Sequence, residues 1–280
     1  MIFAERQALN MKYMINYANS NYARTQKLCS KSGLIFGFDK IIEYSEKNID
    51  KEFKAKNAEI LRQKRGNGLW LWKPYIIKKT LDEMNYGDIL FYCDSGAFIF
   101  RKPAPVFEIL RNQDIWVTVL PLVERQFTKR YTFLAMNMNE SSYINSPQIS
   151  GSFMAFKKSC FTEQFVTEWL EYCCNKEILE PPKDRTDEYD DFVSHREDQS
   201  ILSLLIKKYN IKCYEDPSQF GKVPEKYAQP GYKMLYYSNK DYSPFIIHHR
   251  TSDANLKVIF RQIMCIVLPR SLSLKMLRTR

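Results

Sequence analysis

The sequence lacks the patterns that mark several protein classes. Its seven cysteines are odd in number and form no Cys-x-x-Cys pair, so neither a disulfide framework nor a zinc site is indicated. No run approaches the ~20 apolar residues of a membrane span, and the N-terminal apolar run breaks at Glu5. No phosphate loop of the Gly-x4-Gly-Lys-Ser/Thr type occurs. We therefore expect a cytoplasmic protein without a secretory signal, and a P-loop phosphoryl transferase is disfavoured.

Acidic residues are missing from the C-terminal stretch. The chain has 42 Lys and Arg against 32 Asp and Glu, a net charge of +10 that favours anionic partners. Residues 254–280 hold six basic and no acidic residues, so the remainder carries only +4. This distribution disfavours a broad nucleic-acid surface, and no nucleic-acid partner is expected.

Short apolar runs alternate with stretches of helical periodicity. Strands are expected at 12–17, 40–44, 90–93, 115–120, 148–156, 211–214 and 244–247, and helices at 22–31, 53–65, 74–84, 104–111, 124–136, 162–175 and 200–209. Without a repeat or linker, this alternation predicts one α/β domain over residues 1–253, with a mostly parallel central sheet flanked by helices. Residues 180–197 are expected to form an exposed loop or lid.

The tail, residues 254–280, mixes apolar and basic residues. This composition is typical of a basic amphipathic segment that lies against an anionic membrane surface. A C-terminal helix docked on the domain is the alternative.

Asp94 ends the apolar run 90–93 and is followed by Ser95 and Gly96. An isolated charge is too costly to bury. In open α/β sheets, the carboxyl ends of the strands face the crevice where ligands bind. The sequence thus predicts Asp94 at the rim of a ligand site, with a turn-capping Asp as the alternative.

Further candidates lie at other element ends. Trp70 and Lys73 precede a helix that Pro74 can begin, and a helix N-terminus attracts anions. His248 and Arg250 follow the last apolar run. Asp94 and His248 could bind Mn²⁺ or Mg²⁺ together with phosphate oxygens.

Two cationic side chains and a candidate general base add to the possible metal and phosphate site. Lys73 and Arg250 could neutralise a diphosphate, and Asp198 could act as general base for an acceptor hydroxyl. Jointly these residues indicate transfer of a group from a nucleotide diphosphate.

Four segments resemble bacterial GT-A nucleotide-sugar glycosyltransferases of capsule and lipopolysaccharide synthesis. They are Gly66-x-Gly-Leu-Trp-Leu-Trp-Lys-Pro-Tyr75, Gly87-Asp-Ile-Leu-x-Tyr-x-Asp-Ser-Gly96, Glu197-Asp-Gln-Ser-Ile-Leu-Ser203 and His248-His-Arg250. The resemblance spans residues 12–252. It implies a GT-A, Rossmann-like fold and transfer of a hexose from a nucleotide sugar, UDP-sugar foremost. The implied acceptor is a hydroxyl of a glycan or lipid-linked molecule.

The resemblance also assigns roles. It matches Asp94 to the carboxylate that binds the metal and the diphosphate, Asp198 to the acidic residue at the acceptor, and Tyr17–Asn19 to the site of the base and ribose. Together with the residue chemistry above, the predicted donor site is Tyr17, Ala18, Asn19, Lys73, Asp94, Ser95, Gly96 and Arg250, the acceptor site is Trp70, Glu197 and Gln199, and the metal site is Asp94 and His248. Only one Asp stands where many family members have two, which weakens the expectation of a strict metal requirement.

The setting of Asp198 leaves the stereochemistry open. Arg196-Glu197-Asp198 resembles the motif of inverting enzymes, in which the Asp is the base, and we favour this interpretation. Asp198-Gln199 resembles a segment of retaining enzymes, which need no such base. A non-catalytic protein that binds nucleic acid or polysaccharide is the alternative of another class.

Overall fold

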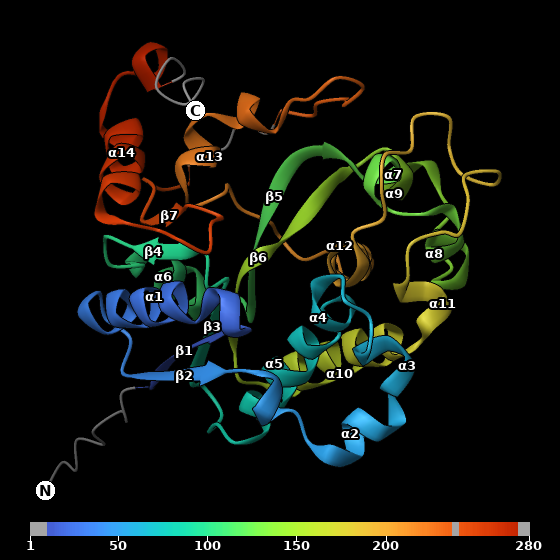
Figure 1. Ribbon diagram of the computed structural model, residues 1–280, viewed down its shortest axis with the longest axis horizontal. Coiled ribbons are helices and arrows are strands. Elements are labelled where there is room, and N and C mark those ends of the chain that lie inside the picture. The colour runs from blue at the N-terminus through green and yellow to red at the C-terminus, as the bar shows by residue number, and fades with distance from the viewer. Residues whose placement is uncertain (1–9, 237–240, 274–280) are drawn as a thin grey trace, which may run out of the picture.

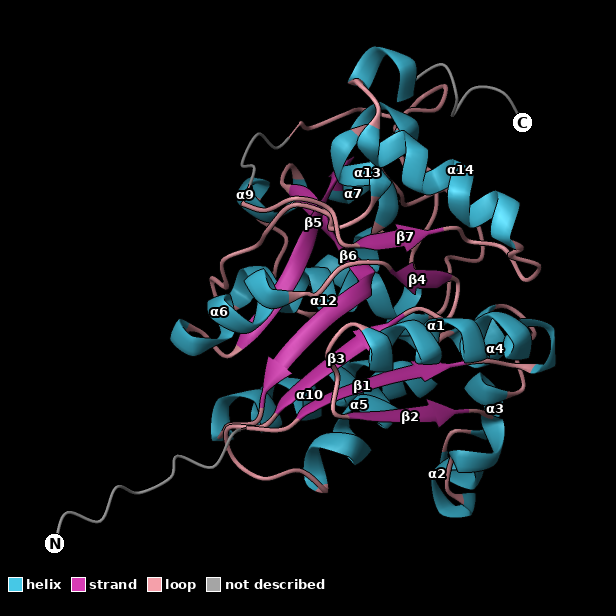
Figure 2. Cartoon of the chain, turned by 90° about the vertical axis from the view of Figure 1, so that its left-hand side faces the viewer, coloured by secondary structure: helices cyan, strands magenta, loops and turns pink. Residues whose placement is uncertain are grey.

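A computed structural model describes residues 10–236 and 241–273 (Figure 1). Its centre is a five-stranded sheet in the order β2-β1-β3-β6-β5, in which the strands lie side by side (Figure 2). The bounds are β1 Lys12–Tyr17, β2 Lys40–Tyr44, β3 Ile89–Cys93, β5 Ile115–Val123 and β6 Pro147–Lys157. β1 pairs in parallel with β2 and β3, whereas β6 is antiparallel to both β3 and β5. Four strands therefore run in one direction, which confirms the predicted α/β class and mostly parallel sheet.

Helices cover both faces of this sheet because successive strand residues point to opposite sides. Tyr92 belongs to one core, together with α5 (Trp72–Asp82), α10 (Cys160–Cys174) and α12 (Glu197–Lys208). Its neighbour Phe91 belongs to a second core, together with α1 (Ala23–Ile35) and α6 (Ala104–Asn112). The central strand β3 is buried on both faces along its whole length. A ligand can therefore approach this strand only beyond its ends.

A two-stranded sheet brings the end of the chain beside β3. β4 (Ala97–Ile99) is antiparallel to β7 (Ile246–His248), and Ala97 pairs with His248. β4 was not predicted, because three residues after Gly96 give no periodic signal. This pairing places the His248–Arg250 segment next to the residues that follow Asp94.

Three sequence predictions of regular structure were wrong. The helix expected at 53–65 is divided into α2 (Lys51–Lys56) and α3 (Ala58–Leu61) at Asn57, whose amide donates to the Phe53 carbonyl. The helix expected at 124–136 is divided into α7 (Glu124–Phe127) and α8 (Arg130–Ala135), because Thr128 is extended. The strand expected at 211–214 is reduced to one bridge between Tyr214 and Thr118.

The remaining elements are short apart from α14. They are η1 Ser20–Tyr22, η2 Glu46–Asn48, α4 Gly66–Leu69, α9 Ser141–Ile144, α11 Lys176–Leu179, α13 Gln219–Lys222, η3 Pro224–Tyr227 and α14 Leu256–Val267. Residues 180–196 form a loop without helix or strand, as expected, although Arg125 ties it down by pairing with Asp191. Among the described residues, no helix is both long and apolar enough to cross a bilayer. The tail residues 274–280 lie outside the described part.

Candidate active site

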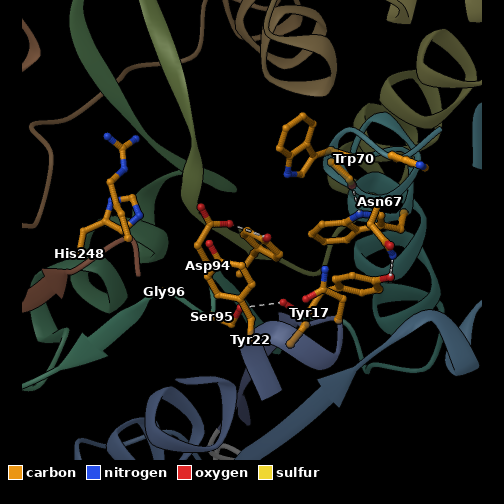
Figure 3. A pocket seen from close by; sticks show the side chains of 15 residues that line it. Tyr17, Tyr22, Asn67, Trp70, Asp94, Ser95, Gly96 and His248 are labelled. Carbon is orange, nitrogen blue, oxygen red and sulfur yellow. Dashed lines mark hydrogen bonds between the residues drawn. The ribbon is translucent and has the colours of Figure 1, made fainter. Parts of the chain in front are cut away.

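A cavity of about 390 Å³ lies where the carboxyl ends of β1 and β3 meet the end of β7 (Figure 3). Nine residues of the predicted site line it: Tyr17, Ala18, Asn19, Trp70, Asp94, Ser95, Gly96, His248 and Arg250. Segments from four distant parts of the chain therefore converge on one cavity.

The end of β1 is joined to the end of β3 by a side-chain hydrogen bond. The Ser95 hydroxyl donates to the Tyr17 carbonyl oxygen at 2.8 Å. The Tyr17 ring stacks on Trp72, with centroids 3.8 Å apart and planes inclined by 13°. Asn67 donates a hydrogen bond to the Tyr17 hydroxyl. This wall thus combines aromatic faces with amide and carbonyl groups.

A left-handed turn forms the adjoining wall. All five residues from Gly66 to Trp70 have positive φ, between 52° and 98°. Glycine and asparagine tolerate this conformation at 66–68, whereas Leu69 and Trp70 are strained by about 1–2 kcal/mol each. The turn is held by the Trp72 indole, which donates to the Gly66 carbonyl at 2.9 Å. Backbone strain of this kind concentrates at ligand sites, and here it presents Trp70 and Asn67 to the cavity.

Asp94 lies near the middle of the cavity, with His248 on one side and Trp70, Asn67 and Tyr17 on the other (Figure 3). Its Oδ1 accepts a 2.7 Å hydrogen bond from the Tyr92 hydroxyl. No cation of the described chain lies within ion-pair distance of this carboxylate. Asp94 is therefore oriented by Tyr92 and available to a ligand.

The segment after β7 supplies nitrogen groups. The Arg250 amide donates to the Gly96 carbonyl at 3.0 Å, and a Cβ on Gly96 would lie 3.4 Å from the Arg250 Cα. Burial lowers the pKa of His248 well below its usual value, and the charge of Arg250 lowers it further. His248 is thus a neutral imidazole, and its buried Nδ1 has no hydrogen-bond partner in the described part of the chain.

Asp94 and His248 fit a divalent cation in their chemistry. An available carboxylate and a neutral imidazole with a free nitrogen are ligands of Mn²⁺ or Mg²⁺ when phosphate and water oxygens complete the shell. No cluster of three or more metal-ligating side chains occurs within residues 10–236 and 241–273. The protein would therefore hold such an ion only weakly without a phosphate ligand.

Lys73 and Asp198 form a buried ion pair that does not line the cavity. Lys73 Nζ lies 3.1 Å from Asp198 Oδ2 and donates to the Gly151 carbonyl at 2.9 Å. Burial opposes the charge of Lys73, but Asp198 and Asp94 outweigh it and raise the pKa of the amine. Burial raises the pKa of Asp198 to about 7, although the charge of Lys73 opposes the rise. The assigned roles of these two residues remain predictions.

Glu197 and Gln199 also lie outside the cavity wall. Glu197, with φ 37°, pairs with Arg65 at 2.5 Å. Gln199 accepts from the Gly151 amide at 3.0 Å and so supports the carbonyl that holds Lys73. Their predicted contact with an acceptor stays a prediction.

Sequence reasoning missed several lining residues. They are Tyr22, Lys64, Gly66, Asn67, Trp72 and Tyr92. The Gly-x-Gly spacing ahead of Trp70 was a usable signal for the residues at 66, 67 and 72. No sequence pattern marked Tyr22 as a lining residue, because it reaches the cavity through the short 3-10 turn η1.

Comparison with known proteins gives structural similarities alone. No family profile and no curated protein sequence matches the chain. Mouse xyloside xylosyltransferase 1 is similar with TM-score 0.45 and 11% identity, over 89% of this chain and 98% of its own. The galactosyltransferase LgtC is similar with TM-score 0.48 and 13% identity, over 84% and 86%.

The glycosyltransferase GlyE of Streptococcus pneumoniae is similar with TM-score 0.45 and 13% identity, over 95% of this chain and 63% of its own. All three TM-scores are below 0.5.

Proposed function

We propose that the protein is a glycosyltransferase that moves a hexose from a nucleotide-diphosphate sugar, UDP-sugar foremost, to a hydroxyl of a glycan or lipid-linked acceptor. One observation carries the proposal: Asp94, a carboxylate with no ion-pair partner among the described residues, lies between an aromatic wall and the segment His248–Arg250 in a cavity at the carboxyl ends of parallel strands (Figure 3). The Tyr17–Trp72 stack and Asn67 suit a base and ribose. Arg250 suits a diphosphate, whose charge grows as it leaves.

The two ends of the cavity thus have separate tasks. Arg250 stabilises the departing diphosphate, and Asp94, held by Tyr92, binds the donor's ribose, sugar or metal-bound phosphate. Mn²⁺ or Mg²⁺ at Asp94 and His248 would neutralise leaving-group charge. Lys73 adds a fixed positive charge within electrostatic range of Asp94, although it does not line the cavity.

Ligand-induced stabilisation tests this proposal. A ligand at 100 times its dissociation constant adds about 2.7 kcal/mol to the unfolding free energy. We expect UDP-sugars with Mn²⁺ to raise the melting temperature of the wild type, and Asp94→Ala to abolish sugar transfer. Asp253→Ala, at an exposed Asp paired only with exposed Arg24, is the control. The absence of any melting shift across UDP-, GDP-, ADP- and CDP-sugars would contradict the proposal.

Two stereochemical outcomes remain for this site. For inversion, Asp198 would accept the proton of the acceptor hydroxyl, and its pKa of about 7 suits a general base. Retention is the second candidate, and it is favoured by the burial of Asp198 against Lys73 behind the cavity. The anomeric configuration of the first product, measured by proton NMR before mutarotation, distinguishes the two.

We also propose that α14 contacts an anionic membrane surface. Phe260 and Val267 are 64% and 69% exposed on this helix, whereas Ile259 and Cys265 are buried against the domain. An amphipathic helix with exposed apolar residues and basic neighbours suits the bilayer interface. Such a contact would bring the enzyme close to lipid-linked acceptors of surface polysaccharide synthesis.

A further inference from the structure

Arg196 is a cation that the proposed mechanism does not use. It precedes α12 and is half-buried, and its guanidinium lies 4.2 Å from the centre of the Phe127 ring. Within the described part of the chain, no carboxylate lies within 4 Å of it and its side chain donates no hydrogen bond. An arginine held in one orientation by stacking, with its donors free, is suited to bind an anion.

The acidic groups within electrostatic range of Arg196 or Arg250 are already bound to other partners. Glu197, next to Arg196 in the chain, pairs with Arg65 at 2.5 Å. Glu124, within electrostatic range of Arg196, accepts from Lys207 and Ser203. Asp216, within electrostatic range of Arg250, accepts from the Ser218 amide at 2.8 Å and from the Tyr227 hydroxyl at 3.1 Å. Among the described residues, none of these carboxylates forms an ion pair with Arg196 or Arg250.

Arg196 and Arg250 share a neighbour, Tyr227. Both lie within electrostatic range of Tyr227 and of each other. Arg250 lies 5.4 Å from the Phe220 ring centre and 5.9 Å from that of Tyr227. Burial lowers the pKa of Arg196, and the charge of Arg250 lowers it further. Two neighbouring cations that form no ion pair of their own repel each other, and a bound anion relieves this repulsion.

The position of this pair indicates which ligand supplies the anion. Arg250 lines the cavity, and His248 of the same segment lies across Asp94 from the aromatic wall at Tyr17 (Figure 3). Arg196 does not line the cavity, but it lies within electrostatic range of Arg250. The proposed donor has its diphosphate at Arg250 and an uncharged hexose attached to it, so an anion at Arg196 has to come from the acceptor.

We propose that Arg196 binds an anionic group, a carboxylate or a phosphate, on the acceptor, so that the enzyme prefers acidic acceptor sugars over neutral ones. This inference rests on the proposed glycosyltransferase function. A hydrogen bond to a charged group is strong enough to give about a tenfold preference, which corresponds to about 1.4 kcal/mol.

Saturation-transfer NMR on the protein saturated with UDP and Mn²⁺ tests the inference. The probes are methyl β-D-glucuronide, glucose 6-phosphate and methyl β-D-glucoside, which present a carboxylate, a phosphate and no charge. We expect at least one acidic probe to bind about tenfold more tightly than the neutral one, and the stronger of the two identifies the anion. Equal binding of all three, or of none, overturns the proposal.

Three variants separate recognition of the acceptor from other roles. Arg196→Gln should remove the preference to within about twofold, whereas Arg196→Lys should keep part of it because the charge remains. Arg185→Gln is the matched control: Arg185 also stacks on an aromatic ring, Phe192, but its guanidinium donates to the carbonyls of Phe192 and Val193. It should keep the full preference.

Calorimetric titration with UDP distinguishes failure of the inference from failure of the function. A tenfold loss of UDP affinity in Arg196→Gln would show that Arg196 serves the donor, and would overturn the inference while the glycosyltransferase function stands. Failure of the wild type to bind any nucleotide would reject the proposed function itself. Unfolding curves of both Arg196 variants verify that they are folded at the NMR temperature.

Discussion

Asp198→Asn should stabilise the protein at neutral pH, although it removes one member of a buried ion pair. Burial is the largest influence on Asp198, and it raises the pKa to about 7 from an ordinary 3.8. An acid with a raised pKa binds more protons in the folded than in the unfolded state between these two values. Stability is therefore lost as the pH rises from 3.8 to 7.

The size of the expected stabilisation follows from the interval between the ordinary pKa of 3.8 and the raised pKa of about 7. At 1.36 kcal/mol for each pH unit, ionising Asp198 costs the folded state about 4 kcal/mol at pH 7 and above. Asn resembles the protonated Asp in shape and never ionises, so the variant avoids this cost. We expect a gain of about 4 kcal/mol at pH 7–8 that shrinks to near zero at pH 4.

Urea unfolding of both proteins at pH 4, 5, 6, 7 and 8 measures the difference. Asp82→Asn is the control, since Asp82 pairs with Lys78 on an exposed helix face, and its effect should stay within about 0.5 kcal/mol. A loss of 3–5 kcal/mol in Asp198→Asn at every pH, the usual result of breaking a buried pair, would refute the reasoning. It would mean that Lys73 keeps Asp198 ionised in the folded state.

Other perturbations test separate features of the molecule. His195 is buried with its pKa lowered to about 3, so stability should fall by about 2 kcal/mol between pH 6.5 and 5 through this group, and urea unfolding of His195→Gln should show a smaller fall. Gly68→Ala should lower the unfolding free energy by about 2 kcal/mol or more, because Gly68 has φ 98° and its Cβ would lie 2.9 Å from the Leu61 Cα. Gly37→Ala has similar φ and no neighbour within 4 Å, so a calorimetric melt should show a smaller loss. The double variant Phe260→Glu/Val267→Glu should bind anionic vesicles at least about tenfold less in co-sedimentation, whereas Leu134→Glu, at an exposed leucine of α8, should not differ from wild type.

Local patterns in the sequence were sufficient to predict the strands of the central sheet and the position of the Asp94 carboxylate. The bounds of β1 and β2 match their predictions, because each is a short apolar run with polar ends. Asp94 directly follows β3 and lines the cavity, where the sequence predicts it. A buried strand followed by Asp is recognisable within a few residues, so these features need no knowledge of distant parts of the chain.

Features that depend on distant contacts could not be predicted. Lys73 meets Asp198 only because α5 and α12 pack on the same face of the sheet, and neither residue carries a signal for the other. The short strand β4 exists through its partner β7. The left-handed path of Leu69 and Trp70 contradicts their ordinary preferences and is fixed by the surrounding packing.

The turn at 66–70 connects two parts of the site that would otherwise be independent. Trp70 is on the cavity surface, and the helix that holds Lys73 begins only two residues later. The backbone that carries the Trp70 ring therefore leads directly into the helix start that carries Lys73. A substitution that alters the path of this turn can affect the cavity wall and the Lys73–Asp198 ion pair at once.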